Sequence, residues 1–298
     1  MANAVEVADL RKSYGSVDAV RGISFDVAEG EVFALLGPNG AGKTTTVEIL
    51  EGFRKRDGGR VSVLGYDPAS EDPRLKEKMG IVLQTTGVDP YLTVAETVDM
   101  FRGYYPAPRP RDEVLKLVGL EDSAKIRVTR LSGGQKRRLD VAVALAGDPS
   151  VLFLDEPTTG FDPGARRQAW EVIKGLAGLG KTIFLTSHAM DEVQYLADRV
   201  VIISSGQIVA QGTPDTLAGR QAAGVLIRFR LPASASLPDS LRTQARVDDG
   251  AVEIQTADAT RTLYDLTSWA VQSGVSLDGL EVTRPSLEDV YLEITREK

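Results

Sequence analysis

The sequence has no cysteine and a single histidine, His188, among its 298 residues. Without cysteine the chain has no disulfide framework and no thiolate metal site. No stretch reaches the ~18 consecutive apolar residues of a membrane-spanning helix. The first residues also lack the basic and apolar regions of a signal peptide. We therefore expect no transmembrane segment and no signal peptide, so that any role at a membrane depends on a partner.

Basic residues are outnumbered by acidic ones. The chain has 35 Lys and Arg against 42 Asp and Glu, which gives a net charge of −7. A surface that mainly holds nucleic acid needs an excess of cations, so we expect no nucleic-acid partner. The length exceeds that of one ordinary domain but is short for two large ones. We expect a main domain followed by a small one.

The clearest pattern is a glycine-rich stretch, residues 37–44, which we call the phosphate loop. It fits G-x-x-x-x-G-K-[ST], with an apolar run before it and a helix-compatible segment after it. Glycines let the backbone approach an anion at the positive end of the following helix. Lys43 is expected to contact the β- and γ-phosphates of a nucleoside triphosphate, and the Thr44 hydroxyl to bind Mg²⁺. The predicted nucleotide-binding residues are Gly37, Pro38, Asn39, Gly40, Ala41, Gly42, Lys43, Thr44 and Thr45.

A second pattern is the apolar run 151–154, which ends in two carboxylates, Asp155 and Glu156. Such a run suits a parallel strand buried on both faces, whose carboxyl end lies at the ligand-binding edge of an α/β sheet. Asp155 suits Mg²⁺ binding, and Glu156 suits orienting and deprotonating a water molecule. Two adjacent carboxylates at a buried strand end are costly without a cation or donors, which favours a site over a structural role.

Several residues are open to both a structural and a functional interpretation. Tyr14 can pack at a strand end or stack on a purine. Gln84 ends a short apolar strand, and His188 follows the strand predicted over 182–187, both at positions where α/β sheets place ligand groups.

The stretch 131–135, Leu-Ser-Gly-Gly-Gln, precedes a helix predicted from Lys136 to Ala146. Its glycines and serine suit either an anion-binding helix N-terminus or an ordinary loop with an N-cap serine. The basic trio 136–138 is expected to be a solvated helix face.

Hydrophobic periodicity predicts the remaining elements. An antiparallel opening is expected over 5–30, and a helix capped by Thr93 and Glu96 is followed by another over 111–118. A hairpin over 199–212 closes the main domain. In the small domain we expect a strand over 225–231, a hairpin about 249–250, a helix over 262–273 and a capped helix over 285–292.

The order of these motifs points to a family. The stretch 131–135 follows the phosphate loop and precedes the Asp155–Glu156 strand end. In this arrangement residues 5–217 resemble the ATP-binding subunit of an ATP-binding cassette (ABC) transporter. The stretch 131–135 matches that family's signature motif, and we call it the signature segment. The resemblance implies an α/β P-loop NTPase fold, with a mixed sheet, an antiparallel β subdomain and a helical subdomain over about 85–147.

The resemblance also implies roles for single residues. Asp155 matches the metal-binding Walker B carboxylate, and Glu156 the catalytic glutamate. His188 matches the histidine that contacts the γ-phosphate and holds the attacking water, and Lys43 the catalytic lysine of the Walker A loop. The other matches are the adenine-stacking Tyr14, the metal-linked Q-loop Gln84, the D-loop Asp162, and Ser132, Gly133, Gly134 and Gln135, which contact ATP bound to a second subunit.

By the same resemblance the protein uses ATP and Mg²⁺ as a head-to-tail dimer and powers a membrane-spanning permease from the cytoplasmic face of the cell membrane. Residues 1–217 are expected to form the nucleotide-binding domain, 218–224 a linker and 225–298 a small α/β domain. The run 285–292 resembles the end of the domain that follows the cassette in type-2 exporters, the daunorubicin-type drug-resistance ATPases among them. The implied cargo is a drug, a lipid or another hydrophobic or polymeric molecule.

A soluble ABC-type mechanoenzyme and an ATP-gated regulatory protein stay open as alternatives. The span between the phosphate loop and the signature segment is too short for a long coiled-coil insert, and a second phosphate loop is absent. Glu156 and His188 are both present, which favours ATP turnover over a purely regulatory switch.

Overall fold

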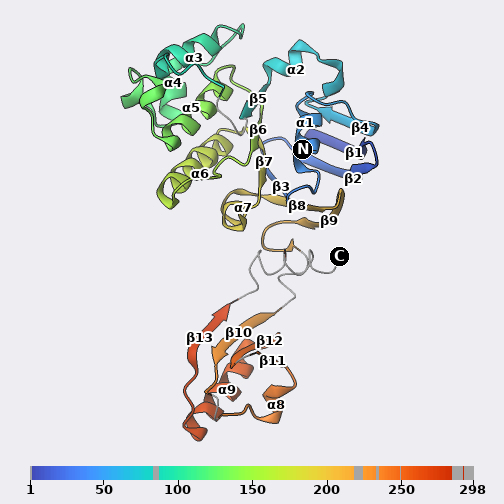
Figure 1. The fold of residues 1–298 in the computed structure, drawn as a ribbon, viewed down its shortest axis with the longest axis vertical. Coiled ribbons are helices and arrows are strands. Elements are labelled where there is room, and N and C mark those ends of the chain that lie inside the picture. Colours follow the sequence, from blue (N-terminus) through green and yellow to red (C-terminus); the bar gives the residue numbers. More distant parts are fainter. Residues whose placement is uncertain are drawn as a thin grey trace. The chain divides into compact units, whose positions relative to one another are not determined.

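The computed structural model describes residues 2–82, 87–217, 224–232, 235–248, 250–283 and 291 (Figure 1). The chain divides into two compact units, residues 1–214 and 215–298. The first unit ends at Pro214, whereas the predicted nucleotide-binding domain ended at Leu217. Apart from Gly224, the predicted linker lies outside the described residues.

The first unit is built on a six-stranded sheet in the order β5-β6-β7-β3-β8-β9. Neighbouring strands are parallel except β8 and β9, which form the predicted hairpin. The central strands are apolar runs buried on both faces, as parallel strands inside a domain are. The six strands are β3 (Val32–Leu36), β5 (Met79–Val82), β6 (Val151–Asp155), β7 (Thr182–Ser187), β8 (Arg199–Ser204) and β9 (Gln207–Gly212).

A three-stranded antiparallel sheet, β2-β1-β4, contains the predicted antiparallel opening. Phenylalanine rings join it to the larger sheet, because Phe25 of β2 stacks on Phe33 of β3 at a centroid distance of 5.2 Å. Phe33 in turn lies 5.2 Å from Phe184 of β7. This core holds β3, the strand from which the phosphate loop leaves. The strands are β1 (Asn3–Tyr14), β2 (Val17–Ala28) and β4 (Gly58–Val63).

Helices flank the larger sheet, and α3, α4 and α5 pack together as a helical layer opposite the antiparallel strands (Figure 1). α3 begins at the predicted capping box, in which Thr93 and Glu96 each bind the other's backbone N–H. Among the described residues, no helix combines the length and apolar character needed to cross a bilayer. The helices are α1 (Lys43–Leu50), α2 (Pro73–Glu77), α3 (Val94–Arg102), α4 (Arg111–Leu117), α5 (Gly133–Leu145), α6 (Pro163–Gly178) and α7 (Met190–Leu196).

The second unit is a four-stranded antiparallel sheet, β11-β12-β10-β13, with two helices. β11 and β12 pair in antiparallel fashion, as the predicted hairpin requires, and α9 begins at Ala259, before the predicted Thr262, because Asp258 caps it. The helix predicted over 285–292 lies outside the described residues except for Tyr291. Neither α8 nor β13 was predicted. The elements are β10 (Val225–Arg230), α8 (Asp239–Arg242), β11 (Ala245–Asp248), β12 (Ala251–Thr256), α9 (Ala259–Ser273) and β13 (Asp278–Thr283).

Candidate active site

The phosphate loop joins β3 to α1, and at two of its positions only glycine fits. Gly42 is the N-cap of α1 with a φ of +103°, and a Cβ there would lie 2.3 Å from the carbonyl oxygen of Ala19. A Cβ at Gly37 would lie 2.4 Å from the carbonyl oxygen of Ile203. The backbone can therefore turn tightly onto the N-terminus of α1, where free N–H groups suit a phosphate.

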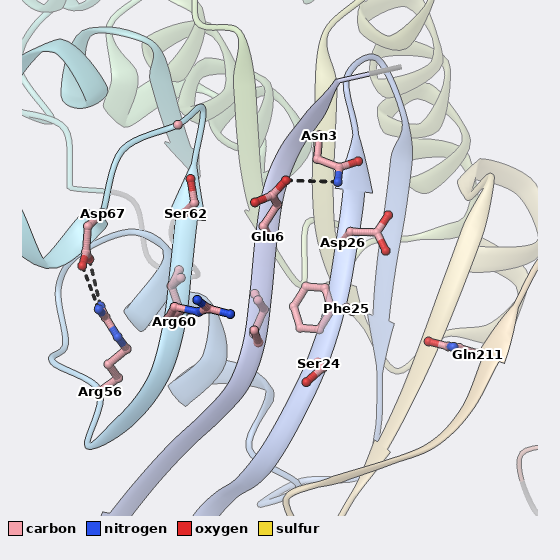
Figure 2. A pocket seen from close by; sticks show the side chains of 14 residues that line it. Asn3, Glu6, Ser24, Phe25, Asp26, Arg56, Arg60, Ser62, Asp67 and Gln211 are labelled. Atoms are coloured by element: carbon pink, nitrogen blue, oxygen red, sulfur yellow. Dashed lines mark hydrogen bonds and ion pairs between the residues drawn. The ribbon is translucent and has the colours of Figure 1, made fainter.

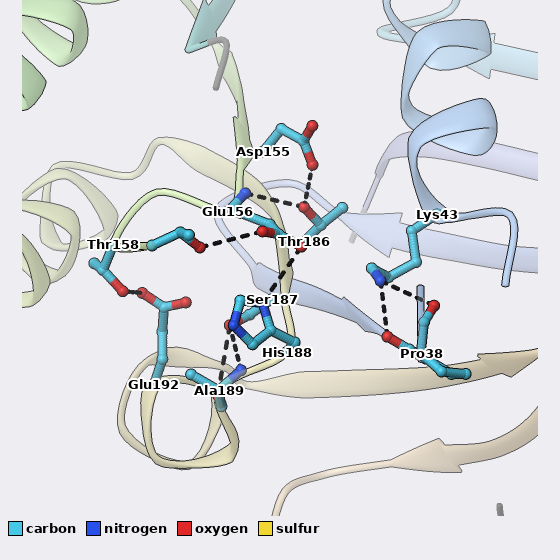
Figure 3. A network of polar contacts seen from close by, with 12 residues as sticks. Pro38, Lys43, Asp155, Glu156, Thr158, Thr186, Ser187, His188, Ala189 and Glu192 are labelled. Atoms are coloured by element: carbon cyan, nitrogen blue, oxygen red, sulfur yellow. Dashed lines mark hydrogen bonds and ion pairs between the residues drawn. The ribbon is translucent and has the colours of Figure 1, made fainter. Parts of the chain in front are cut away.

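Lys43, the first residue of α1, folds its side chain back over this loop (Figure 3). Its Nζ donates to the carbonyl oxygens of Gly37 at 2.7 Å and Pro38 at 3.2 Å. An ammonium group has three N–H bonds, so one is left for a phosphate oxygen. Burial lowers the pKa of Lys43, whereas Glu156 and Asp155 raise it. Both carboxylates therefore act electrostatically on the ammonium of the phosphate loop.

Asp155 and Glu156 are held at the carboxyl end of β6 by Thr186, which β7 places opposite Asp155. The Thr186 hydroxyl donates to Asp155 Oδ1 and accepts the N–H of Glu156 at 3.1 Å. Glu156 has a φ of +46°, in the left-handed region that residues with a Cβ rarely adopt. Its Oε2 accepts a hydrogen bond from Thr159 Oγ1 at 3.1 Å. The backbone and the side chain of Glu156 are thus both fixed.

His188 follows β7 directly and reaches the same place (Figure 3). Its Nδ1 lies 3.4 Å from Glu156 Oε1, and its side chain is 57% exposed. Because Nδ1 faces this carboxylate, Nε2 is left for a ligand. The structure therefore brings Lys43, Asp155, Glu156 and His188 together where β3, β6 and β7 end, the edge at which α/β sheets bind ligands.

The predicted magnesium ligands are Thr44, Gln84 and Asp155. Thr44 is exposed beside Lys43 at the start of α1, and Asp155 uses one of its two oxygens for Thr186. Gln84 lies outside the described residues. Among the residues that the structure describes, no group of three or more His, Asp or Glu could hold a metal alone. Hydroxyl and carboxylate oxygens fit Mg²⁺, which takes few protein ligands and completes its shell with water and phosphate oxygens.

Tyr14 ends β1 and is 40% exposed. The Cζ of Arg54 lies 5.1 Å from its ring centroid, and the Nζ of Lys12 lies 5.5 Å from it. These cation–π contacts hold the ring at the surface. Adenine stacking on this ring stays a prediction.

The signature segment lies at the start of α5. This helix begins at Gly133, and the prediction of a start at Lys136 is wrong, because Ser132 and Gln135 form a capping box. Gln135 Oε1 accepts the N–H of Ser132 at 2.9 Å, and Ser132 Oγ accepts the N–H of Gln135 at 3.2 Å. Gly133 and Gly134 are therefore in the first helical turn. Contact of this segment with a nucleotide stays a prediction.

Asp162 is the N-cap of α6. Its Oδ1 accepts the N–H groups of Gly164 and Ala165, both at 2.9 Å. This contact accounts for an aspartate at the start of the helix. The D-loop role of Asp162 stays a prediction.

Sequence reasoning missed a buried carboxylate behind the site. Glu192 of α7 is 1% exposed and accepts a hydrogen bond from Thr158 Oγ1 at 2.7 Å (Figure 3). It also accepts one from Trp170 Nε1 at 3.1 Å. These bonds tie the segment after Glu156 to α6 and α7. Only the packing of these two helices reveals the contact, because the three residues are far apart in the sequence.

The prediction that 136–138 form a solvated helix face is wrong for Arg137. Its side chain is 11% exposed and contacts the backbone beside Glu156. The charge of this residue favoured a solvated position, and only its contacts with the backbone at the end of β6 show otherwise.

A separate open hollow of about 870 Å³ lies over β1, β2 and β4 (Figure 2). Four of its polar side chains pair with one another, Asn3 with Glu6 at 3.2 Å and Arg56 with Asp67 at 2.7 Å. Among the described residues, none that was predicted for the site lines it. We therefore place the candidate site at the edge of the six-stranded sheet.

Comparison with known proteins decides the family. A family model described as ABC transporter matches residues 20–159, which contain the phosphate loop, the signature segment and Glu156. A linearmycin resistance ATP-binding protein of Bacillus subtilis is 35% identical over 304 residues, which cover 98% of each chain. The chain belongs to the ATP-binding proteins of ABC transporters. A second family model, ABC transporter domain-containing protein-like, C-terminal domain, matches residues 225–286 of this ABC protein.

Two further relatives are similar over nearly the whole length of this chain. A daunorubicin resistance ATP-binding protein of Streptomyces coeruleorubidus is 36% identical and covers 98% of this chain and 95% of its own. A Nod factor export ATP-binding protein of Rhizobium meliloti is 38% identical, over 98% of this chain and 88% of its own.

Solved structures show the same cassette fold. A subunit of an ABC transporter complex from Clostridium perfringens has a TM-score of 0.66 at 29% identity, over 72% of this chain and 90% of its own. A dimeric cassette in a post-hydrolysis state with ADP and phosphate has a TM-score of 0.62 at 26% identity, over 70% of this chain and 98% of its own. The ABC protein is thus an ATP-binding and ATP-hydrolysing subunit with the predicted fold, and these relatives do not favour the two alternatives.

Proposed function

We propose that the carboxyl edge of β3, β6 and β7 binds ATP with Mg²⁺ and hydrolyses it with Glu156 as the general base. The convergence of Lys43, Asp155, Glu156 and His188 at that edge carries this proposal (Figure 3). The backbone N–H groups of residues 37–45, apart from Pro38, and the Lys43 ammonium bind the β- and γ-phosphates.

Thr44 and Asp155, with Gln84 as the third predicted ligand, would hold Mg²⁺. When bound, Mg²⁺ neutralises phosphate charge and polarises the bond to be broken. Asp155 is prepared for this role because the Thr186 hydroxyl fixes its carboxylate.

Glu156 is positioned to accept a proton from a water molecule. Thr186 binds its N–H and Thr159 binds Oε2, which leaves Oε1 facing His188. His188 is expected to contact the γ-phosphate through Nε2 and to hold the attacking water against Oε1. The two side chains thus act as one unit, with the histidine orienting the water and the glutamate taking its proton.

The working form is expected to be a head-to-tail dimer of two copies. ATP on the phosphate loop of one copy is completed by Ser132, Gly133, Gly134 and Gln135 of the other. The exposure of Ser132 at the N-terminus of α5 supports this, as does the dimeric cassette among the similar structures. Tyr14 stacks on the adenine, and Asp162 lies at the contact between copies. Because ATP favours the closed dimer and ADP the open one, turnover moves the subunits.

A membrane-spanning permease is the partner that uses this movement. The protein binds it from the cytoplasmic face of the cell membrane through the helical layer, around residues 84–105. Two large aromatic side chains near α3 support this surface, because Tyr91 is 75% exposed and Tyr104 is 74% exposed.

The cargo class follows from the relatives, whose names refer to linearmycin resistance, daunorubicin resistance and Nod factor export. We propose a type-2 exporter of drugs, lipids or other hydrophobic or polymeric molecules. Residues 225–298, after the linker, stabilise or regulate the dimer. Co-purification with the permease, followed by ATPase assays against candidate cargoes, tests this assignment.

The Glu156→Gln variant tests the mechanism. We expect kcat to fall by at least about 10²-fold because the base is lost, whereas ATP binding and ATP-dependent dimerisation persist. Glu121→Gln, an exposed glutamate away from the site, is the matched control. Near-normal turnover by Glu156→Gln would remove this residue from the role of base.

A further inference from the structure

Arg137 is a charged side chain enclosed by the protein close to the site. It is 11% exposed, and its Nη1 lies 3.8 Å from Oδ2 of the buried Asp140. Burial lowers the pKa of its guanidinium, and Asp140, Asp155 and Glu192 raise it. Enclosing a guanidinium is costly unless defined contacts use its donors.

The guanidinium binds the backbone on both sides of Glu156. Its Nη2 donates to the carbonyl oxygen of Asp155 at 3.0 Å, and its Nε donates to that of Pro157 at 3.1 Å. A planar guanidinium presents these donors at a fixed spacing, so it holds the two carbonyl groups relative to each other. A lysine ammonium on a flexible stem lacks this geometry.

The peptide held in this way has an unfavourable conformation. The φ of +46° at Glu156 persists only where the surroundings hold it. This conformation directs the carboxylate toward His188, whose Nδ1 is 3.4 Å from Oε1. A displacement of about 1 Å at a reacting group can cost about 10²-fold in rate. The placement of the guanidinium is therefore expected to matter for hydrolysis.

The helix that carries Arg137 also carries the signature segment. Ser132 caps α5, and Arg137 follows five residues later, which is about 7.5 Å along the helix axis. Over so short a distance a helix moves as a unit. A shift of Ser132 therefore moves the guanidinium relative to β6 and to Glu156.

We propose that Arg137 is a positioning residue that holds Glu156 in its hydrolytic orientation and makes that orientation depend on the placement of α5. This inference rests on the proposed function, in which Ser132 meets the ATP of a second copy while Glu156 serves the ATP of its own copy. Arg137 then links the two ATP sites of a dimer, so that occupation of one site prepares the base of the other.

The test compares Arg137→Gln, Arg137→Lys and a control, Lys136→Gln, which removes the same charge from the preceding position. For each full chain we would measure kcat, KM and the Hill coefficient with MgATP, the Kd for a fluorescent ATP analogue, and the thermal midpoint. We expect Arg137→Gln to lose at least about tenfold in kcat, with KM and Kd within about twofold of the parent. Its Hill coefficient falls toward one. Arg137→Lys lies between, and the control behaves as the parent.

A kcat of Arg137→Gln within about twofold of the control would overturn the proposal, as would a loss that only follows the unfolded fraction. If Arg137→Gln does not fold, Arg137→Lys tests the proposal in its place. Parental kcat and cooperativity in Arg137→Lys would also overturn it, because a lysine cannot bind both carbonyl groups as the guanidinium does. A parent chain without ATP turnover, or full turnover by Glu156→Gln, would instead contradict the proposed function. The two failures are therefore distinguishable.

Discussion

The N-termini of α1 and α5 both follow glycine-rich segments, yet they are built differently. Before α1 the backbone adopts a φ of +103° at Gly42 and packs against a neighbouring carbonyl group. Lys43 is buried there, and its ammonium interacts electrostatically with Glu156 and Asp155. At the start of α5 a capping box binds the helix N-terminus, and the two glycines of the signature segment are already helical. A Cβ on Gly133 would contact nothing within 4 Å.

The difference shows which parts of an active site one chain can supply. The phosphate loop has a cation, a tight turn and carboxylates from β6 at the same edge. The signature segment has an exposed serine and free helix N–H groups, which suit an anion brought from outside. This contrast supports the proposal that the second helix end completes the site of another copy.

The largest effect is expected at the phosphate loop. Lys43→Ala removes the cation on the phosphates, and we expect kcat/KM for ATP to fall about 10³-fold. Lys116→Ala, on the exposed side of α4, is the control and should leave both constants unchanged. Parental ATP affinity and turnover in Lys43→Ala would refute the assignment of this loop.

The second effect is expected at the signature segment. Ser132→Arg places a bulky side chain where the proposed dimer closes, so kcat should fall about 10²-fold while one chain still binds ATP. Ser132→Thr keeps a hydroxyl and the helix cap, and it should retain most of the activity. ATP binding that is lost together with turnover in Ser132→Arg would place this serine in the same site as Lys43.

The third effect is on the free energy of unfolding, in which substitution of Gly42 and of Gly133 should differ. Gly42→Ala meets both a positive φ and the Ala19 carbonyl oxygen, so we expect a loss of about 2 kcal/mol or more in the free energy of unfolding. Gly133→Ala lies in an open helical position and should change stability by at most about 0.5–1 kcal/mol, in the stabilising direction. Denaturant unfolding measures both. Equal losses would mean that the two glycines serve the same purpose.

The smallest effect is a pH dependence of folding stability that comes from Glu51, at the C-terminal end of α1. Burial, followed by Asp155 and Glu48, raises the pKa of Glu51 to about 8 from 4.5. Because the folded state then binds a proton that the unfolded state has lost, this group lowers stability as pH rises from about 4.5 to about 8. We expect Glu51→Gln to remove a decline of about 1–2 kcal/mol between pH 6 and pH 8. Glu77→Gln is the exposed control, and identical pH profiles for all three proteins would contradict a protonated Glu51.

The sequence predicted the parts of the site that depend on contiguous residues. Lys43 belongs to a contiguous motif, and Asp155 and His188 follow apolar runs long enough to mark strand ends. The antiparallel opening and both predicted hairpins were likewise set by short-range alternation and turns.

The residues that were missed depend on contacts between distant elements. Thr186 acts on Asp155 only because β6 and β7 pair in one register. Arg137 is enclosed because its place on α5 brings it against the backbone at the end of β6. The early start of α5 did have a local signal, the spacing of Ser132 and Gln135, but the poor helix propensity of two glycines obscured it.

Mixing two inactive variants tests the division of labour between the helix ends most directly. Lys43→Ala chains keep an intact signature segment, and Ser132→Arg chains keep an intact phosphate loop. In a mixed dimer these two intact parts face each other, so we expect the mixture to hydrolyse ATP faster than the sum of the two variants assayed alone. A mixture that gains nothing would contradict an active site shared between two copies.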